Sequence, residues 1–269
     1  MKRRQFLLAI LVVLPCGATN ATLLDAGYQQ MYDLQFDGAH HAFRQWEQLH
    51  PEDPMGPVSD AAAYLFSEFD RMRVLQSEFF VDNDSFLHLR RLNSDPAVKA
   101  CFESALVHGQ LLAERVLKGS PDDENALLAS VLRLGLHADY LALVEKRYLT
   151  SLNEMKQGRD VAGKLLAAHP RCYDAYLAVG VENYMLSLKP APIRWLLRAG
   201  GAQTDKDVGI ANLRLTASNG HYLMPYARLL LAVAALRDNN RPQAKRTLAW
   251  LAGAYPRNRL YREELAKLQ

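Results

Sequence analysis

The sequence predicts an all-α protein built from successive pairs of helices. From residue 23 onward apolar residues recur at intervals of three and four, as in Leu229, Val233 and Leu236, and the alternating runs typical of strands are almost absent. Small residues also recur at a fixed distance from a following proline near both ends of the chain. Because the 269 residues are 49% hydrophobic, we expect a folded chain with a core of its own.

The first 21 residues have the composition of a secretory signal peptide. Lys2, Arg3 and Arg4 precede an apolar run over residues 6–15, and small residues follow up to Ala21. We expect cleavage after Ala21, with an earlier cut near Ala18 as the alternative. The text of residues 3–7, RRQFL, resembles a twin-arginine export signal and fits general secretion equally well. The sequence therefore predicts an exported protein, periplasmic or otherwise envelope-associated, with one helical domain over 22–269.

The charge balance excludes a general attraction to nucleic acid. The chain has 32 basic and 29 acidic residues, and three of the basic ones lie at positions 2–4 of the expected signal peptide. The rest of the chain holds 29 of each sign. Such a balanced body lacks the positive surface that phosphate backbones require, so we expect no nucleic-acid partner.

The repeat is clearest in the two end units. Gly27, Ala39 and Pro51 lie twelve residues apart, and the same spacing places a second set at positions 232, 244 and 256. A small residue on each of two antiparallel helices lets their backbones approach closely, and a proline after the second helix ends it. Bulky residues follow the second small residue by four and seven positions, as expected for the inner face of the second helix: Phe43, Trp46, Leu248 and Leu251.

This spacing resembles the tetratricopeptide repeat, in which a helix A and a helix B each carry a small residue. Residues 207–260 also resemble the C-terminal part of exported bacterial tetratricopeptide-like proteins of unassigned role. The resemblance implies an α-α superhelix with a binding surface on the inner face of the A helices. The fold class expected here is such a solenoid with irregular, expanded middle repeats.

Three further units align on the same rule, with longer separations between their two helices. Their A helices begin near Ser59, Glu124 and Tyr173. The paired contact positions of the A and B helices are Ala61 with Gly109, Val131 with Gly158, and Gly180 with Gly209. The separations are 48, 27 and 29 residues, against 12 in the end units. In the fourth unit His221 stands where the others have a proline.

Two of the insertions have a composition of their own. Residues 78–85 are acidic and aromatic, and Ser85 is a candidate cap for a short helix through Leu92. Residues 189–201 are isolated from the flanking helices by Pro190, Pro192 and a pair of glycines. Arg194, Trp195 and Arg198 lie inside this second insertion. We expect it to contact a membrane surface or a partner through Trp195, or alternatively to fold back over the solenoid.

No motif predicts a catalytic centre, a cofactor or a metal ion. The eight histidines form no i, i+4 pair, and no cysteine–histidine cluster is present. Asp122, Asp123 and Glu124 open a helix, where negative charge is favourable. Cys101 and Cys172 are expected to be two buried free thiols, with a disulfide between them as the alternative.

The resemblance implies that a partner contacts the inner face of the A helices. The residues matching that face are Tyr28, Tyr32, Asp174, Tyr184, Met185, Tyr226 and Arg237. Tyrosine and arginine often anchor interfaces; the alternative is that several of these residues only pack against the next helix. We therefore expect a non-catalytic exported scaffold for a protein or peptide partner, in an envelope assembly or polymer-export complex as the family resemblance implies. The alternative is an envelope enzyme or small-ligand-binding protein that uses the insertions.

Overall fold

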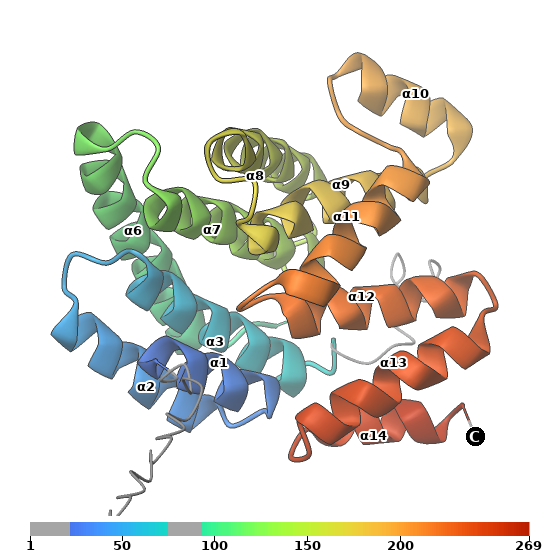
Figure 1. Ribbon diagram of the computed structural model, residues 1–269, viewed down its shortest axis with the longest axis horizontal. Coiled ribbons are helices and arrows are strands. Elements are labelled where there is room, and N and C mark those ends of the chain that lie inside the picture. The colour runs from blue at the N-terminus through green and yellow to red at the C-terminus, as the bar shows by residue number, and fades with distance from the viewer. Residues whose placement is uncertain (1–21, 75–92, 269) are drawn as a thin grey trace, which may run out of the picture.

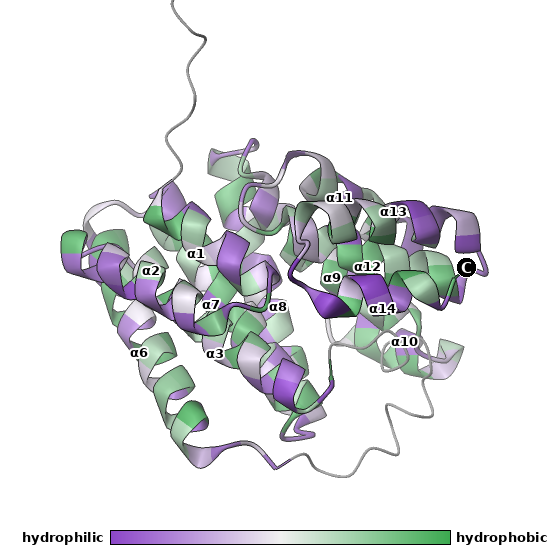
Figure 2. Cartoon of the chain, turned by 90° about the horizontal axis from the view of Figure 1, so that it is seen from below, coloured by the Kyte–Doolittle hydropathy of each residue, from purple (hydrophilic) through white to green (hydrophobic). Residues whose placement is uncertain are grey.

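The computed structural model describes residues 22–74 and 93–268, and in this part of the chain the regular structure is helical, with no strand. The expected signal peptide and the expected short helix over 85–92 lie outside the described residues. In Figure 2 most helices carry both a hydrophobic and a hydrophilic side, which is the pattern of helices half-buried in a core.

The described helices pack as the five predicted pairs (Figure 1). The first pair is α1 (Leu23–Tyr32) with α2 (Phe36–Leu49), and the second is α3 (Met55–Arg71) with α6 (Pro96–Gly119). The third is α7 (Glu124–Leu143) with α8 (Tyr148–Ala168). The fourth is α9 (Tyr176–Ser187), preceded by the short turn η1 (Tyr173–Ala175), with α11 (Lys206–Asn219). The last is α12 (Met224–Arg237) with α13 (Arg241–Ala254), followed by α14 (Arg259–Ala266).

The small residues of the repeat lie at the helix contacts, as predicted. A Cβ atom added at Gly27 would overlap the Phe43 ring, and one added at Gly109 would overlap Val58. In the fourth pair a Cβ at Gly209 would lie 2.6 Å from the backbone nitrogen of Tyr184. In the last pair Ala232 and Ala244 are fully buried. The twelve-residue spacing therefore has the predicted cause, a close approach of two helix backbones.

The helix starts follow ordinary capping chemistry. The Thr22 hydroxyl accepts from the backbone N–H of Asp25, whose carboxylate accepts from the Thr22 N–H, closing a capping box at α1. Asp123 caps α7 at the residue before the predicted start, Glu124. Helix α3 begins at Met55 and not at Ser59. Its Pro57 lies in the first turn, where a missing N–H leaves no hydrogen bond unmade.

The two ends of the described chain contact one another. The backbone N–H of Arg257 donates to Asp33 Oδ1 at 3.0 Å, and Asn258 Nδ2 donates to the carbonyl of Tyr32 at 2.8 Å. The rings of Tyr28 and Tyr222 stack with centroids 4.7 Å apart. Helix α1 therefore packs against segments from the last two pairs. The inner face of the A helices, expected to be a binding surface, therefore lines a cavity.

Two other features concern expectations from the sequence. Cys172 is buried and Cys101 exposed, and both are free thiols, so the prediction of a buried side chain is wrong for Cys101.

Among the described helices α7 is long and apolar enough to cross a membrane, but 61% of its apolar stretch is buried inside the protein. Helix α7 packs on α8, α6 and α3, so it is the central core helix of this structure.

Helix α10 (Ala191–Ala199) is the element that leaves the paired arrangement, as predicted for residues 189–201. It stands apart from the helix pairs in Figure 1 and contains no buried residue. Its C-terminal end is held to α8, because Lys156 donates to the Gly200 carbonyl and Arg159 to the Gly201 carbonyl.

Candidate functional site

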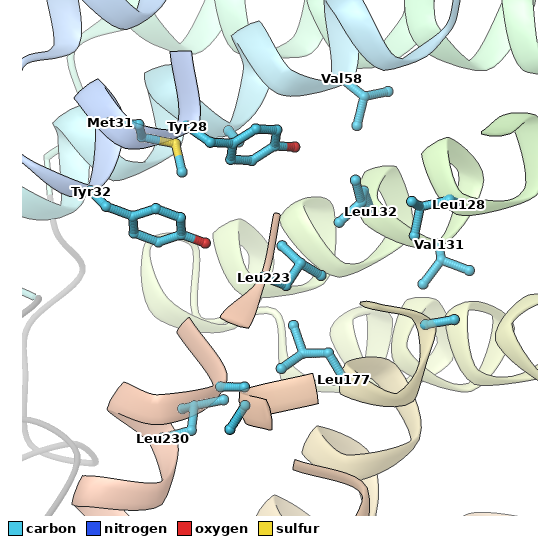
Figure 3. Packing of buried hydrophobic residues seen from close by; sticks show 14 of the residues in the cluster. Tyr28, Met31, Tyr32, Val58, Leu128, Val131, Leu132, Leu177, Leu223 and Leu230 are labelled. Carbon is cyan, nitrogen blue, oxygen red and sulfur yellow. The ribbon is translucent and has the colours of Figure 1, made fainter. Parts of the chain in front are cut away.

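The candidate site is a cavity on the inner face, formed where the first helices of all five pairs meet. Its volume is about 880 Å³ including the space at its mouth. Figure 3 shows Tyr28 and Tyr32 on one side of this region and Leu132, Leu177 and Leu223 across from them. The lining comes from α1, α3, α7, the segment from η1 to α9, and α12, with Met155 and Gly158 added by α8.

A simple register rule explains which side chains line the cavity. In α1 Tyr28 and Tyr32 follow the contact residue Gly27 by one and five positions, and both line the cavity. In α3 the contact residue is Ala61, and Ala62 and Phe66 line the cavity. In α7 the contact residue is Val131, and Leu132 and Leu136 line it. In α9 Val181, one position after Gly180, lines it as well. Side chains four residues apart lie on one face of a helix. This shared face therefore turns toward the centre of the molecule.

The polar group that stands out in this lining is Asp139. The Tyr226 hydroxyl donates to Asp139 Oδ2 over a long distance of 3.5 Å. The apolar surroundings remove water from the carboxyl and raise its pKa to about 7. Burial and the nearby Asp139 together raise the pKa of Tyr226 well above its usual value, so the phenol keeps its proton. These surroundings thus favour the protonated form of Asp139 more than water does.

The second carboxyl of the lining, Asp174, has a structural role. Its two oxygens accept from the backbone N–H groups of residues 221, 222 and 223 at 2.9, 3.0 and 3.1 Å. Burial raises its pKa, and these bonds act in the opposite direction. They also explain why His221 replaces the expected proline, because proline has no N–H to donate.

Aromatic rings form one wall of the cavity. The centroids of Tyr28 and Tyr32 lie 6.4 Å apart, those of Tyr32 and Phe66 6.2 Å, and those of Phe66 and Tyr226 5.8 Å. The Tyr28 hydroxyl is occupied, since it accepts from Ser59 Oγ at 3.0 Å. Burial raises the pKa of Tyr28 and Tyr32 above the usual range of a phenol, so both rings stay neutral.

Of the ten predicted site residues, the structure brings four together at the cavity: Tyr28, Tyr32, Asp174 and Tyr226. Three others lie elsewhere on the paired helices. Tyr184 is buried in the contact between α9 and α11, and Met185 and Arg237 are half-buried outside the cavity lining. The prediction missed Phe66, Asp139 and Met155. The register rule applied to α3 would have found Phe66, whereas no sequence signal marks Asp139.

The remaining three residues lie on α10. Trp195 and Leu196 are 72% and 66% exposed, and Ile193 beside them is 47% exposed. The two arginines turn the other way: Arg194 donates to the carbonyl of Lys189 at 3.0 Å, and Arg198 donates to Thr204 Oγ1 at 2.6 Å. Helix α10 therefore presents its apolar side to solvent and uses its charged side to hold the segment together.

Among the described residues no group of three histidine, cysteine or acidic side chains is placed to hold a metal ion. No family model matches this chain, and no curated protein matches its sequence.

Proposed function

We propose that this protein is a non-catalytic binding protein with a tetratricopeptide-like superhelical fold, which takes an apolar part of a protein or peptide partner into its inner cavity. The observation that carries the proposal is the convergence of all five first helices on one largely apolar cavity. A cavity of this kind binds by burying the apolar surface of its ligand.

The polar groups of the cavity favour binding over catalysis. Asp174 is occupied by three backbone N–H groups and Tyr28 by Ser59. Asp139 with Tyr226 is then the one titratable pair left for chemistry in this lining. The lining formed by the described residues holds no serine, cysteine, histidine, lysine or arginine that would complete an acid–base or nucleophilic centre with this pair. We propose on this ground that the protein is not an enzyme.

The second candidate is a protein that binds a small molecule. The specific observation in its favour is the composition of the lining, which is mostly apolar and aromatic with a few polar groups, as in small-molecule pockets. We assign the peptide partner first because the lining includes the exposed Gly135 of α7, where the side chain of a partner has access from solvent.

The proposal is tested by closing this mouth without disturbing the fold. A Cβ at Gly135 meets nothing within 4 Å, so Gly135→Leu places a side chain at the cavity mouth without a clash. Gly163→Leu is the matched control, because Gly163 is exposed on α8, outside the cavity lining, and its Cβ also meets nothing within 4 Å. Both changes replace a helical glycine by leucine and gain the same helix propensity.

The assay is cross-linking of the exported protein in intact cells, followed by native mass spectrometry of the purified species. We expect the wild type and Gly163→Leu to retain the bound species and Gly135→Leu to lose it. A bound mass of several hundred daltons would assign the small-ligand candidate, and a peptide or protein mass the first. Equal retention by both variants would contradict a binding role for the cavity.

A second proposed role concerns α10, which we assign to contact with an anionic membrane surface. Between Glu182 and Asp205 the chain carries Lys189, Arg194 and Arg198 and no acidic residue. A helix with exposed tryptophan and leucine on one side and positive charge on the other is typical of helices that lie in the interface of a bilayer. The export predicted from residues 1–21 belongs to the same proposal, since it would place α10 next to a membrane.

A further inference from the structure

We propose that the cavity accommodates an organic cation, an ammonium group carried on an apolar chain, with Asp139 as its counter-ion and aromatic rings as its walls. This inference rests on the proposed binding function, because it names the chemical class of the group that the cavity takes. A lysine side chain of a peptide and a small alkylamine both belong to this class.

The first support is the state of Asp139, a half-buried residue of the cavity lining, compared with the buried acids. Six acidic residues are buried in the described chain, and each has a strong partner: Asp33 with the Arg257 N–H, Asp60 with His40, Glu68 with Arg71, Asp174 with three backbone N–H groups, Glu182 with Arg159, and Glu264 with Lys267. Among the described residues no lysine, arginine or histidine lies within 4.0 Å of Asp139, and its one hydrogen bond is the long one from Tyr226.

A carboxyl left in this condition is unfavourable for the empty protein. An ionised carboxylate in apolar surroundings costs several kcal/mol unless a positive charge or several hydrogen bonds compensate it. The raised pKa of Asp139, about 7, is the expected response of the free protein. A cation entering the cavity would supply the missing partner, and the aspartate would then remain ionised.

The second support is the aromatic wall. Tyr32, Phe66 and Tyr226 line the same cavity with successive ring centroids about 6 Å apart. The face of an aromatic ring carries partial negative charge and attracts an ammonium group within about 6 Å of its centre. A carboxylate beside several such faces favours a cation over both a neutral group of the same size and an anion.

The pH dependence follows from the groups that face the cavity. They are Tyr28 and Tyr32 from α1, Asp139 from α7, Asp174 from η1 and Tyr226 from α12; α3, α8 and α9 contribute only apolar side chains and glycine. The phenols stay neutral, so Asp139 is the group that changes its charge near pH 7. Since the cation binds the carboxylate form, its affinity falls as the pH decreases, by about tenfold per pH unit well below 7.

The test uses three probes of equal length on the full mature chain: hexylammonium, 1-hexanol and hexanoate. Binding is measured by isothermal titration calorimetry at pH 8 and pH 6. The variant is Asp139→Asn, which keeps the shape and removes the charge. The matched control is Asp37→Asn, the same change at an exposed position of α2. Thermal unfolding of both variants checks that each remains folded.

We expect the wild type at pH 8 to bind hexylammonium at least tenfold more tightly than hexanol, and to bind hexanoate most weakly. Asp139→Asn should reduce the affinity for hexylammonium at least tenfold and leave hexanol unchanged, while Asp37→Asn changes neither. Equal binding of hexylammonium and hexanol, no binding of hexylammonium, or insensitivity to Asp139→Asn would each overturn the inference. In those cases loss of the bound species by Gly135→Leu would still support the proposed binding function. Retention of the bound species by Gly135→Leu would overturn the binding function together with this inference.

Discussion

The contact between α9 and α11 provides a direct test of the close-packing explanation of the repeat. We predict that Gly209→Ala destabilises the protein, because the new Cβ would lie 2.6 Å from the Tyr184 backbone nitrogen and 2.9 Å from its Cα. These are backbone atoms of a neighbouring helix, so they cannot move aside as the end of a flexible side chain can. Overpacking of this kind costs about 1–3 kcal/mol.

The control is Gly163→Ala on α8, where the added Cβ meets nothing within 4 Å. Both substitutions gain up to about 1 kcal/mol of helix propensity, so the difference between them isolates the packing cost. We expect Gly209→Ala to be less stable than Gly163→Ala by about 1–3 kcal/mol in urea unfolding, with a melting temperature lower by about 2–4 °C for each kcal/mol. Equal stability of the two variants would refute the close approach of α9 and α11.

Four further predictions follow from the cavity, its edge and the two proposed surfaces. The pKa of Asp139 in the folded protein is above its unfolded value of 3.8, so ionisation of Asp139 lowers stability as the pH rises from about 4 through 7. Asp139→Asn should therefore be more stable than the wild type at pH 8, by on the order of 2–4 kcal/mol. At pH 4 the two proteins should have nearly equal free energies of unfolding in urea. Asp174→Ala leaves the N–H groups of residues 221–223 without their acceptor, and we expect it to lower the unfolding free energy by about 2–4 kcal/mol. Trp195→Ala should weaken sedimentation with phosphatidylglycerol vesicles at least fivefold and change the unfolding midpoint little, because Trp195 is 72% exposed. Leu49→Ala, at a position of α2 that is 67% exposed, serves as the control. Unchanged sedimentation of the tryptophan variant would contradict the membrane role. N-terminal sequencing of protein from the cell envelope should begin at Thr22, and a sequence beginning at Met1 would exclude cleavage.

The pairing of the helices was predictable from the sequence because its causes are local. Gly27 and Ala39 lie on consecutive helices, α1 and α2, and the spacing of the small residues indicates where these two helices touch. The start of α7 was predictable for the same reason, because Asp123 caps the helix by accepting from the backbone N–H of Ala126, only three residues away. The register that points Tyr28 and Tyr32 inward is likewise a property of a single helix.

What the sequence by itself determined, then, was the five pairs of helices and, for α1, the face that turns inward. Only the tertiary structure decided how these faces combine. Asp139 and Tyr226 are 87 residues apart in the sequence. Their hydrogen bond depends on how the five helix pairs stack and on the contacts of Asp33 and Asn258 that join the two ends of the described chain. Likewise the outward direction of Trp195 depends on hydrogen bonds that fix Arg194 and Arg198 against their own segment. Periodicity specifies the orientation of a residue about its helix axis, but the distance between residues on separate helices is set by packing along the entire chain between them.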